Sequence, residues 1–384
     1  MSELLEGRWQ DTKSALVEGL TGTKKAVMES TLENTRKYLS ESATAGATSA
    51  GNVATLNRVI LPVIRRVMPT VIANDLVGVQ PMTGPVGQIH TLRVRYSDTA
   101  NGATAGEEAL SPFKIAEAYS GNANGKADST ATLEGAAGNK LSIQILKQTV
   151  EAKTRKLSAR WTFESAQDAQ SQHGIDVEAE IMAALAQEIT AEIDQEVLAS
   201  LRGLAGTYET YNQAAVSGTA TFVGDEHAAL AVQINRVANL IAQRTRRGAG
   251  NWAVVSPFAL TILQSATTSA FARTTEGTFE APTNTKMVGT LNNAMKVYVN
   301  TYAADTAPVL IGYKGSSESD AAAFYCPYIP LMSSGVVLDP GTFEPTVSFM
   351  TRYGYVELNN TASSLGNAAD YLANVAIAAG VTFS

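Results

Sequence analysis

The side chains best suited to acid–base or metal chemistry in this sequence are three histidines, His90, His173 and His227. They are far apart along the chain and fall in three different predicted settings. A metal site or a Ser-His-Asp triad needs each base close to a partner, and no HExxH, GxSxG or paired Cys/His spacing accompanies them. We therefore interpret each histidine as a surface or capping residue. The sequence predicts no catalytic residue and no metal site.

Glycine-rich segments that could hold a phosphate fail the spacing that such loops require. Residues 19–24 (GLTGTK) follow a polar helix instead of a buried strand, and residues 135–142 (GAAGNKLS) lack the GxxxxGK[ST] pattern. Residues 248–250 (GAG) lack the third glycine of a dinucleotide fingerprint and do not open a helix after a strand. We therefore expect no cofactor.

The strongest basic patch lies on a predicted strand and contains Lys147, Lys153, Arg155, Lys156 and Arg160. It lacks the interleaved aromatic side chains of a surface that stacks on bases. The net charge of −7 and the pI of about 5.2 also give no general positive field for nucleic acid. The patch therefore indicates a protein–protein contact.

A helix predicted over residues 175–202 offers a matching acidic surface. Apolar residues at every fourth position from Val177 to Leu201 form one continuous row. At 1.5 Å per residue, such a helix spans roughly 40 Å. Its other faces carry the acidic residues Glu178, Glu180, Glu188, Glu192, Asp194 and Glu196. We expect contacts between subunits, and the candidates are Glu188, Glu192 and Glu196 on the helix and Lys153, Arg155, Lys156 and Arg160 on the strand.

The composition is that of a globular protein, with 384 residues of which 45% are hydrophobic and 17% charged. The single cysteine, Cys326, cannot form an intramolecular disulfide, which fits a reducing cytoplasm. No apolar run reaches about 18 residues, so we expect no membrane span. The N-terminus lacks the basic start and apolar block of a secretory signal.

Three segments can be distinguished before the C-terminal half, in which helices and strands are both predicted. Residues 1–41 form a predicted helical leader with Met28, Leu32, Thr35 and Leu39 on one face, and this face needs a partner surface either on its own domain or elsewhere. Residues 42–51 form a hinge of small residues. Residues 97–142 are rich in small residues, so we expect that they bury no core of their own and are ordered only by neighbouring subunits.

Periodic segments on both sides of residues 97–142 predict the remaining elements. Strands flank it over residues 89–96 and 142–163, and a second helix is predicted over residues 227–243. Another helix is predicted to start at Ser256-Pro257. Further strands are predicted near residues 252–255, 296–300, 309–313, 324–328 and 346–356.

Several sequence blocks, in order along the chain, resemble one known family. The most specific block is VGVQPMTGPVGQ at residues 77–88. The others are LLEGRWQ at 4–10, LENTRKYLSE at 32–41, AQDAQSQHGID at 166–176, RRGAGNW at 246–252, VYVNTYAAD at 297–305, VLIGYKGSSESDAAAFYCPYIPL at 309–331 and FEPTVSFMTRYGY at 343–355. Together they resemble the major capsid proteins of T-even-type, contractile-tailed bacteriophages.

The resemblance implies an α+β fold of the Hong Kong 97 type, with an N-terminal arm, an extended β-hairpin loop, a peripheral domain with a long spine helix, and an axial domain. The implied parts are the leader and arm (1–75), the entry strand and turns (76–96), the tip of the extended loop (97–142), the return strand and spine helix of the peripheral domain (143–204), the axial domain (205–340) and the C-terminal return strands (341–384). T-even relatives carry a sizeable domain inserted in the extended loop. Residues 97–142 are too few to supply it.

The resemblance also implies a structural role with no enzymatic activity. The chain would assemble as hexamers and pentamers into an icosahedral head around double-stranded DNA, which it would meet only by weak, non-specific proximity. Scaffold, portal and decoration proteins would be its partners, and the virion capsid, assembled in the host cytoplasm, its location. The alternatives are an encapsulin-type compartment shell and another phage structural protein, such as a tail-tube protein.

The same family implies that a phage protease removes the leader after a glutamate that follows an apolar residue two positions earlier. Leu39-Ser40-Glu41 fits that pattern, so Glu41 is the candidate cleavage site. Leu32-Glu33 lacks the one-residue spacer and fits less well. This leader is short, and we favour its retention.

Overall fold

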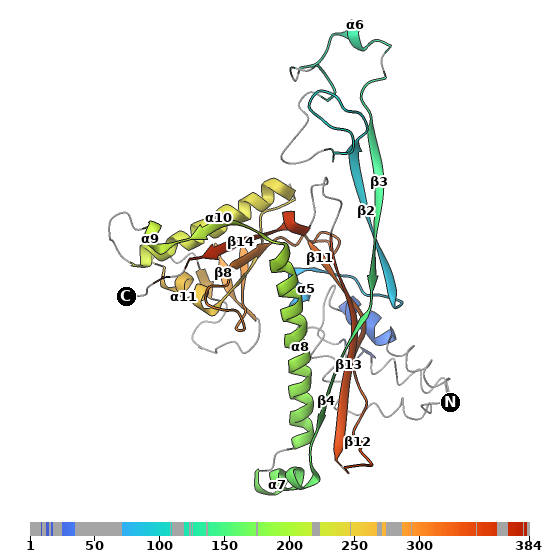
Figure 1. Cartoon of the computed structure of the whole chain (residues 1–384), viewed down its shortest axis with the longest axis vertical. Helices are drawn as coiled ribbons and strands as arrows, with labels where there is room; N and C mark the ends of the chain where they lie inside the picture. The colour runs from blue at the N-terminus through green and yellow to red at the C-terminus, as the bar shows by residue number, and fades with distance from the viewer. Residues whose placement is uncertain are drawn as a thin grey trace. The chain divides into compact units, whose positions relative to one another are not determined.

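The computed structural model of the chain describes residues 25–34, 71–107, 119–122, 126–135, 137–173, 176–216, 223–245, 247–266, 271–273, 286–292, 294–342, 344–358 and 368–378, with positions 9, 13, 14, 17, 109, 124, 380 and 381. The chain forms two compact units (Figure 1). Unit 1 contains Met1–Gly87, Val150–Ala199 and Phe324–Val356, and unit 2 contains Gln88–Thr149, Ser200–Ala323 and Glu357–Ser384.

Unit 1 is built on a five-stranded sheet whose longest strand is β13 (Pro345–Glu357). β13 pairs antiparallel with β4 (Lys153–Arg160) and also neighbours β11 (Ala323–Ser333) and β12 (Val337–Leu338). A short strand, β1 (Gly78–Val79), joins β11 in parallel after the single-turn helix α5 (Ala73–Leu76). The sheet buries Tyr325 and Phe349 almost completely.

The long helix α8 (Val177–Leu204) lies beside β4 and β13 and follows a shorter helix, α7 (Phe163–His173) (Figure 1). Asp176 begins α8 by accepting the amides of Glu178 and Ala179 at 3.1 and 3.4 Å. The apolar row predicted from the sequence is buried from Leu185 to Leu201. The helix predicted over residues 175–202 is therefore confirmed, shifted by two residues.

The leader helix packs on unit 1 over the part that the structure describes. Residues 25–34 are helical, and Met28 and Leu32 are each 1% exposed. The Asn34 side-chain amide donates to the carbonyl oxygens of Met82 at 2.7 Å and Tyr328 at 3.1 Å. Of the two partners left open for this face, the chain's own unit is the one observed. Thr35, Leu39 and the hinge at 42–51 lie outside the described residues.

Unit 2 centres on a seven-stranded sheet with the order β5-β14-β10-β6-β9-β8-β7. Its strands are β5 (Gly206–Tyr211), β6 (Trp252–Val255), β7 (Phe271–Arg273), β8 (Lys286–Leu291), β9 (Met295–Val299), β10 (Val309–Gly312) and β14 (Leu372–Ile377). Its helices are α9 (Gln213–Val216), α10 (Val223–Thr245), α11 (Pro257–Ser265) and the 3-10 turn η1 (Ala368–Tyr371). Buried residues of α10, α11 and the central strands form one apolar core.

The predicted strands and helices of the C-terminal half are confirmed, several to within one residue. The alternation of apolar residues within each strand and the capping residue of each helix were enough to predict these elements. Ser256 caps α11 by accepting the amide of Ala259 at 3.2 Å, as Ser-Pro before an apolar run predicts. Gly312 packs against the Trp252 ring, which leaves no space for a larger residue.

A separate two-stranded ribbon is formed by β2 (Val86–Tyr96) and β3 (Leu141–Glu151) (Figure 1). The segment between them, which includes the short helix α6 (Thr130–Leu133), forms the tip. The Tyr96 and Tyr119 rings lie 4.5 Å apart between centroids and are 8% and 7% exposed. The Tyr119 hydroxyl donates to the Lys140 carbonyl at 2.5 Å, and the Asn139 side chain donates to the Tyr119 carbonyl at 2.6 Å.

The expectation that the tip buries no core of its own is therefore wrong for its described part. Residues 97–142 contain few large apolar side chains, but Tyr119 is one of them. Its ring packs against Tyr96, the last residue of β2. Asn101 and Gly102 make the necessary turn with positive φ angles of 45° and 91°. One buried aromatic pair is enough to give this small segment a defined shape.

We predict that Tyr119→Ala loosens the tip without destabilising either unit. Removing the ring deletes most of the local core, so the amides of Ser97, Ala109 and Lys140 should exchange with solvent at least about tenfold faster. Tyr119→Phe keeps the ring and loses only the hydroxyl bonds, so its effect should be smaller. Hydrogen exchange followed by mass spectrometry measures both. Equal exchange in the Ala variant and the parent chain would contradict the prediction.

Candidate functional site

The three histidines do not form a site. His90 is exposed on β2, and His173 ends α7 with its side chain outside the described residues. His227 is fully buried, with Nδ1 2.5 Å from the Ser265 hydroxyl of α11. Its interpretation as a surface or capping residue is wrong, because α10 begins four residues earlier than predicted and turns this ring towards α11. Within the described ranges, no three His, Cys, Asp or Glu side chains gather as a metal site would require.

Residues 248–250, considered above as a nucleotide loop, serve packing. A Cβ at Gly250 would lie 2.8 Å from the Ile311 side chain, and one at Gly248 would lie 2.5 Å from the Tyr313 ring. Both glycines allow the end of α10 to approach the sheet closely. Cys326 is 2% exposed, and burial raises the pKa of its thiol to about 11, so it is unreactive.

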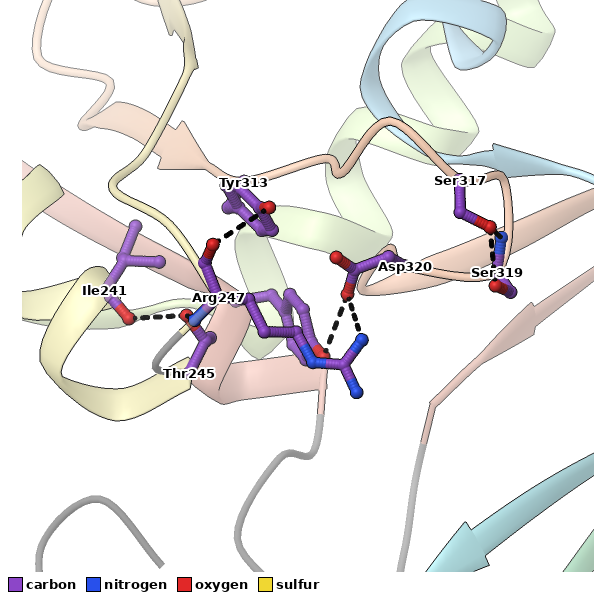
Figure 2. A network of polar contacts seen from close by, with 8 residues as sticks. Ile241, Thr245, Arg247, Tyr313, Ser317, Ser319 and Asp320 are labelled. Carbon is purple, nitrogen blue, oxygen red and sulfur yellow. Dashed lines mark hydrogen bonds and ion pairs between the residues drawn. The ribbon is translucent and has the colours of Figure 1, made fainter.

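A polar network at the end of α10 ties this region to the segment before β11 (Figure 2). Arg247 forms an ion pair with Asp320 at 2.8 Å, and the Tyr371 hydroxyl donates to the same carboxylate oxygen at 3.4 Å. The Tyr313 hydroxyl donates to the Arg247 carbonyl at 3.3 Å. The Arg247 side chain is 57% exposed, so the pair contributes about 0–1 kcal/mol. These contacts connect the end of α10 to the segment before β11 and to Tyr371 within unit 2.

A second network joins β4, β13 and α8 in unit 1, and it involves residues that the sequence had marked as contact candidates. Arg155 binds Glu192 and Glu196 at 2.6 Å each, and its Nε donates to the Tyr353 hydroxyl at 2.6 Å. Tyr353 in turn donates to Glu196. Burial disfavours the charged forms of both Arg155 and Glu196. The mutual hydrogen bonds outweigh it, so the pKa of Glu196 is lowered and that of Arg155 is raised.

Arg155, Glu192 and Glu196 thus bind one another within a single chain. Arg160 lies 3.6 Å from Glu344 of the same unit. Lys153, Lys156 and Glu188 are exposed, so contacts of these three residues with another subunit stay a prediction. Glu41 lies outside the described residues.

Asp194 was placed on the exposed acidic face of α8, and this is wrong. Its side chain is 3% exposed, and Oδ1 accepts the amide of Ile72 at 2.8 Å. Burial raises the pKa of this carboxyl from 3.8 to about 7, although the hydrogen bond lowers it. The clue in the sequence was a second row at every fourth position, which the structure buries throughout: Met182, Ala186, Thr190, Asp194 and Leu198.

The ribbon has an exposed apolar surface on β3, as judged over the part of the chain that the structure describes. Leu141, Ile143 and Ile145 alternate along β3 and are 56%, 69% and 66% exposed. Residues two apart on a strand point to the same face, so they form one line, here called the hairpin stripe. The hairpin stripe is therefore a candidate surface for a contact with another molecule.

The comparisons with known proteins agree on one family. A family model described as major capsid protein Gp23 matches residues 53–140 and 125–377. Major capsid proteins of Enterobacteria phage T4 and Vibrio phage KVP40 are 30% and 29% identical, covering 86% and 85% of this chain and 80% and 82% of theirs. A solved chain from Mycobacterium phage Bobi has a TM-score of 0.51 at 12% identity, covering 80% of this chain and 90% of that one. Among the described helices, none is both long and apolar enough to cross a membrane.

Proposed function

The chain belongs to the Gp23 family of major capsid proteins, with the Hong Kong 97-type α+β fold, and from this membership we propose how it builds a phage head. Copies of the chain assemble as hexamers and pentamers into an icosahedral shell around double-stranded DNA. The observation that carries this assembly is the hairpin stripe, which one chain leaves open to water. A second copy lying under the ribbon removes it from water.

The assignment of parts follows the same family plan. We propose that the ribbon and the tip at 97–142 are the extended loop, that α8 is the spine helix of the peripheral domain, and that the seven-stranded sheet of unit 2 is the axial domain. Unit 1 also takes in residues 1–87 and the strands β11 and β13. Within residues 341–384, β13 therefore lies in unit 1 with residues 1–87, whereas β14 belongs to the seven-stranded sheet of unit 2.

Electron microscopy of the expressed chain tests the assembly. Closed shells of one size range support the proposal, and a product that stays as monomers or forms tubes overturns it. An encapsulin-type compartment would also form shells. Nucleic-acid extraction from particles made in an infected host separates the two, since a phage head contains double-stranded DNA and a compartment contains a cargo enzyme.

The chain's role in the head is structural, as it is for its relatives. We propose that scaffold, portal and decoration proteins bind the assembled shell, and that assembly takes place in the host cytoplasm. The DNA inside meets this protein without specific contacts, because the chain carries a net charge of −7 and its basic strand is partly engaged in ion pairs.

A charge contact between subunits predicts a salt-dependent assembly. Glu188→Gln is expected to weaken assembly by a few-fold at low salt and to have little effect at high salt, because an exposed pair contributes about 0–1 kcal/mol and is screened. Light scattering against salt concentration measures it. Glu180→Gln, an exposed glutamate near the start of the same helix, is the matched control. The same salt dependence in both variants and the parent chain would contradict the proposed contact.

The mass of the protein in mature particles shows whether the leader is retained or cleaved. If the leader is retained, as we favour, intact protein from mature particles has a mass near 40.4 kDa. The packing of residues 25–34 on unit 1 supports retention, because removal would expose the surface that Met28 and Leu32 cover. Loss of the first 41 residues would mean cleavage after Glu41 and would contradict this prediction.

A further inference from the structure

The tip of the ribbon contains both Asn-Gly pairs of the sequence, Asn101-Gly102 and Asn124-Gly125. An asparagine before a glycine loses its side-chain amide readily, because glycine has no Cβ to hinder the approach of its own backbone nitrogen. Both asparagines follow an alanine, so each stands between the same two residue types. Both are exposed to water. The local sequence therefore makes the two pairs similar in reactivity, and a difference between them has to come from the fold.

Asn101 is held in a closed turn. Its side-chain amide donates to the Gly121 carbonyl at 2.8 Å. On either side of the pair, Ala100 and Ala103 exchange two backbone hydrogen bonds, at 3.1 and 3.0 Å. Asn101 and Gly102 make the turn with φ angles of 45° and 91°. Reaction requires the side-chain carbon of Asn101 to reach the nitrogen of Gly102, which breaks the bond to Gly121 and opens the turn. The fold thus protects Asn101.

The side chain of Asn124 has no such restraint. Asn122 closes the loop around it, because its Oδ1 accepts the amides of Asn124 at 3.0 Å and Lys126 at 3.3 Å, and its own amide donates to the Lys126 carbonyl at 2.9 Å. Among the residues that the structure describes, none bonds to the Asn124 side chain. Gly125 lies outside the described residues and contributes only its lack of a side chain. Ring closure at Asn124 therefore costs no side-chain hydrogen bond.

We propose that Asn124 is a site of spontaneous modification on the tip and that Asn101 is the protected asparagine. The backbone nitrogen of Gly125 attacks Cγ of Asn124, the Cγ–Nδ2 bond breaks, and ammonia leaves with the proton that the attacking nitrogen gives up. Water then opens the cyclic imide at either carbonyl, which yields aspartate or isoaspartate. Both products add one negative charge to a chain whose net charge is −7. Isoaspartate also routes the main chain through Cβ, so the tip of an aged chain differs from that of a new one.

Peptide mapping of the full chain tests this assignment. The purified, unassembled chain is kept in mildly alkaline buffer, and mass spectrometry with electron-transfer fragmentation follows the two asparagines separately over time. Asn124 is expected to react at least about tenfold faster than Asn101, because ring closure at Asn101 first requires the loss of a side-chain hydrogen bond and of a closed turn. Circular dichroism confirms that the chain stays folded during the incubation.

The unfolded chain is the matched control, since it keeps both Asn-Gly pairs and loses the turn. In denaturant the two asparagines should react at similar rates. Gly125→Ala should slow the reaction of Asn124 and leave that of Asn101 unchanged, because the new Cβ hinders only one of the two rings. Tyr119→Ala, which loosens the tip, should raise the rate of Asn101 towards that of Asn124.

Three results would overturn the assignment. The first is equal rates in the folded chain, and the second is a faster reaction of Asn101. The third is a rate difference that persists in denaturant, since local sequence and not the fold would then set the order. All of these measurements use the unassembled chain, so their outcome does not depend on whether the chain forms shells.

Discussion

A chain that lacks residues 102–138 is expected to fold normally and to form no closed shells. The deletion leaves Asp98, Thr99, Ala100, Asn101 and Asn139 between Ser97 and Lys140. Ser97 already donates to the Lys140 carbonyl at 2.9 Å, and a five-residue loop closes a hairpin without strain. The core of unit 2 and the sheet of unit 1 contain no residue from the deleted segment. The loss should therefore fall on assembly.

Two measurements check this result. Thermal or denaturant unfolding of the unassembled chain should match the parent to within about 1 kcal/mol, since the deleted tip has only a small core of its own. Electron microscopy and sedimentation should show at least about a hundredfold fewer shells, because each subunit loses its reach to a neighbour at every position in the shell. Tyr119→Phe, which keeps the tip folded, is the control and should assemble. If the chain that lacks residues 102–138 formed shells at normal yield, the tip would not be needed for assembly.

A second large effect is expected at Asp194, where stability should fall as the pH rises. The carboxyl has a pKa of about 7 in the folded chain and 3.8 ordinarily. The folded state therefore keeps a proton that the unfolded chain releases between about pH 4 and pH 7, and unfolding becomes easier across that range. Three pKa units correspond to about 4 kcal/mol, and relaxation around the carboxylate reduces this to about 2–4 kcal/mol.

Asp194→Asn isolates this contribution from all other titrating groups. The amide oxygen can still accept from Ile72, and the side chain carries no charge at any pH. The free energy of unfolding of the variant minus that of the parent should increase by about 1–3 kcal/mol between pH 5 and pH 8, because the unfolded chain has already lost most of this proton at pH 5. Glu188→Gln, exposed on the same helix, should show a constant difference. A constant difference for Asp194→Asn as well would show that this carboxyl is not the buried, proton-binding group that its surroundings indicate.

Local periodicity predicted helix α8 but only part of its buried face. The apolar row from Val177 to Leu201 fixed the helix and its buried face, because period 3.6 places every fourth residue on one side. The row could not show how wide the buried face is. Ile72, just before α5, and Tyr325 of β11 lie next to Asp194 in a second buried row. That width depends on segments more than a hundred residues away, which local periodicity does not contain.

The charged residues predicted as contacts between subunits also show what local sequence can predict and what it cannot. The sequence named Arg155 on the basic strand and Glu192 and Glu196 on the acidic helix among its candidate contacts, and these three residues do meet. Their prediction as contacts between subunits came from placing the basic strand and the acidic helix on different copies. The register of β4 against β13 brings Arg155 opposite Thr351 and next to the helix, so the set closes within one chain. Strand register is a tertiary property, and one residue of slip would have turned Arg155 to the other face.

By itself, the sequence determined the two long helices, most of the longer strands and the family, because periodicity, capping residues and ordered motif blocks are all local. It did not predict α7 or the strands β5, β7, β8, β12 and β14. Only the tertiary structure decided which polar side chains are buried, that Tyr96 and Tyr119 form a core for the tip, and that the hairpin stripe on β3 is exposed. Burial is a relation between distant segments. It depends on what covers a residue, and the sequence around that residue does not specify this.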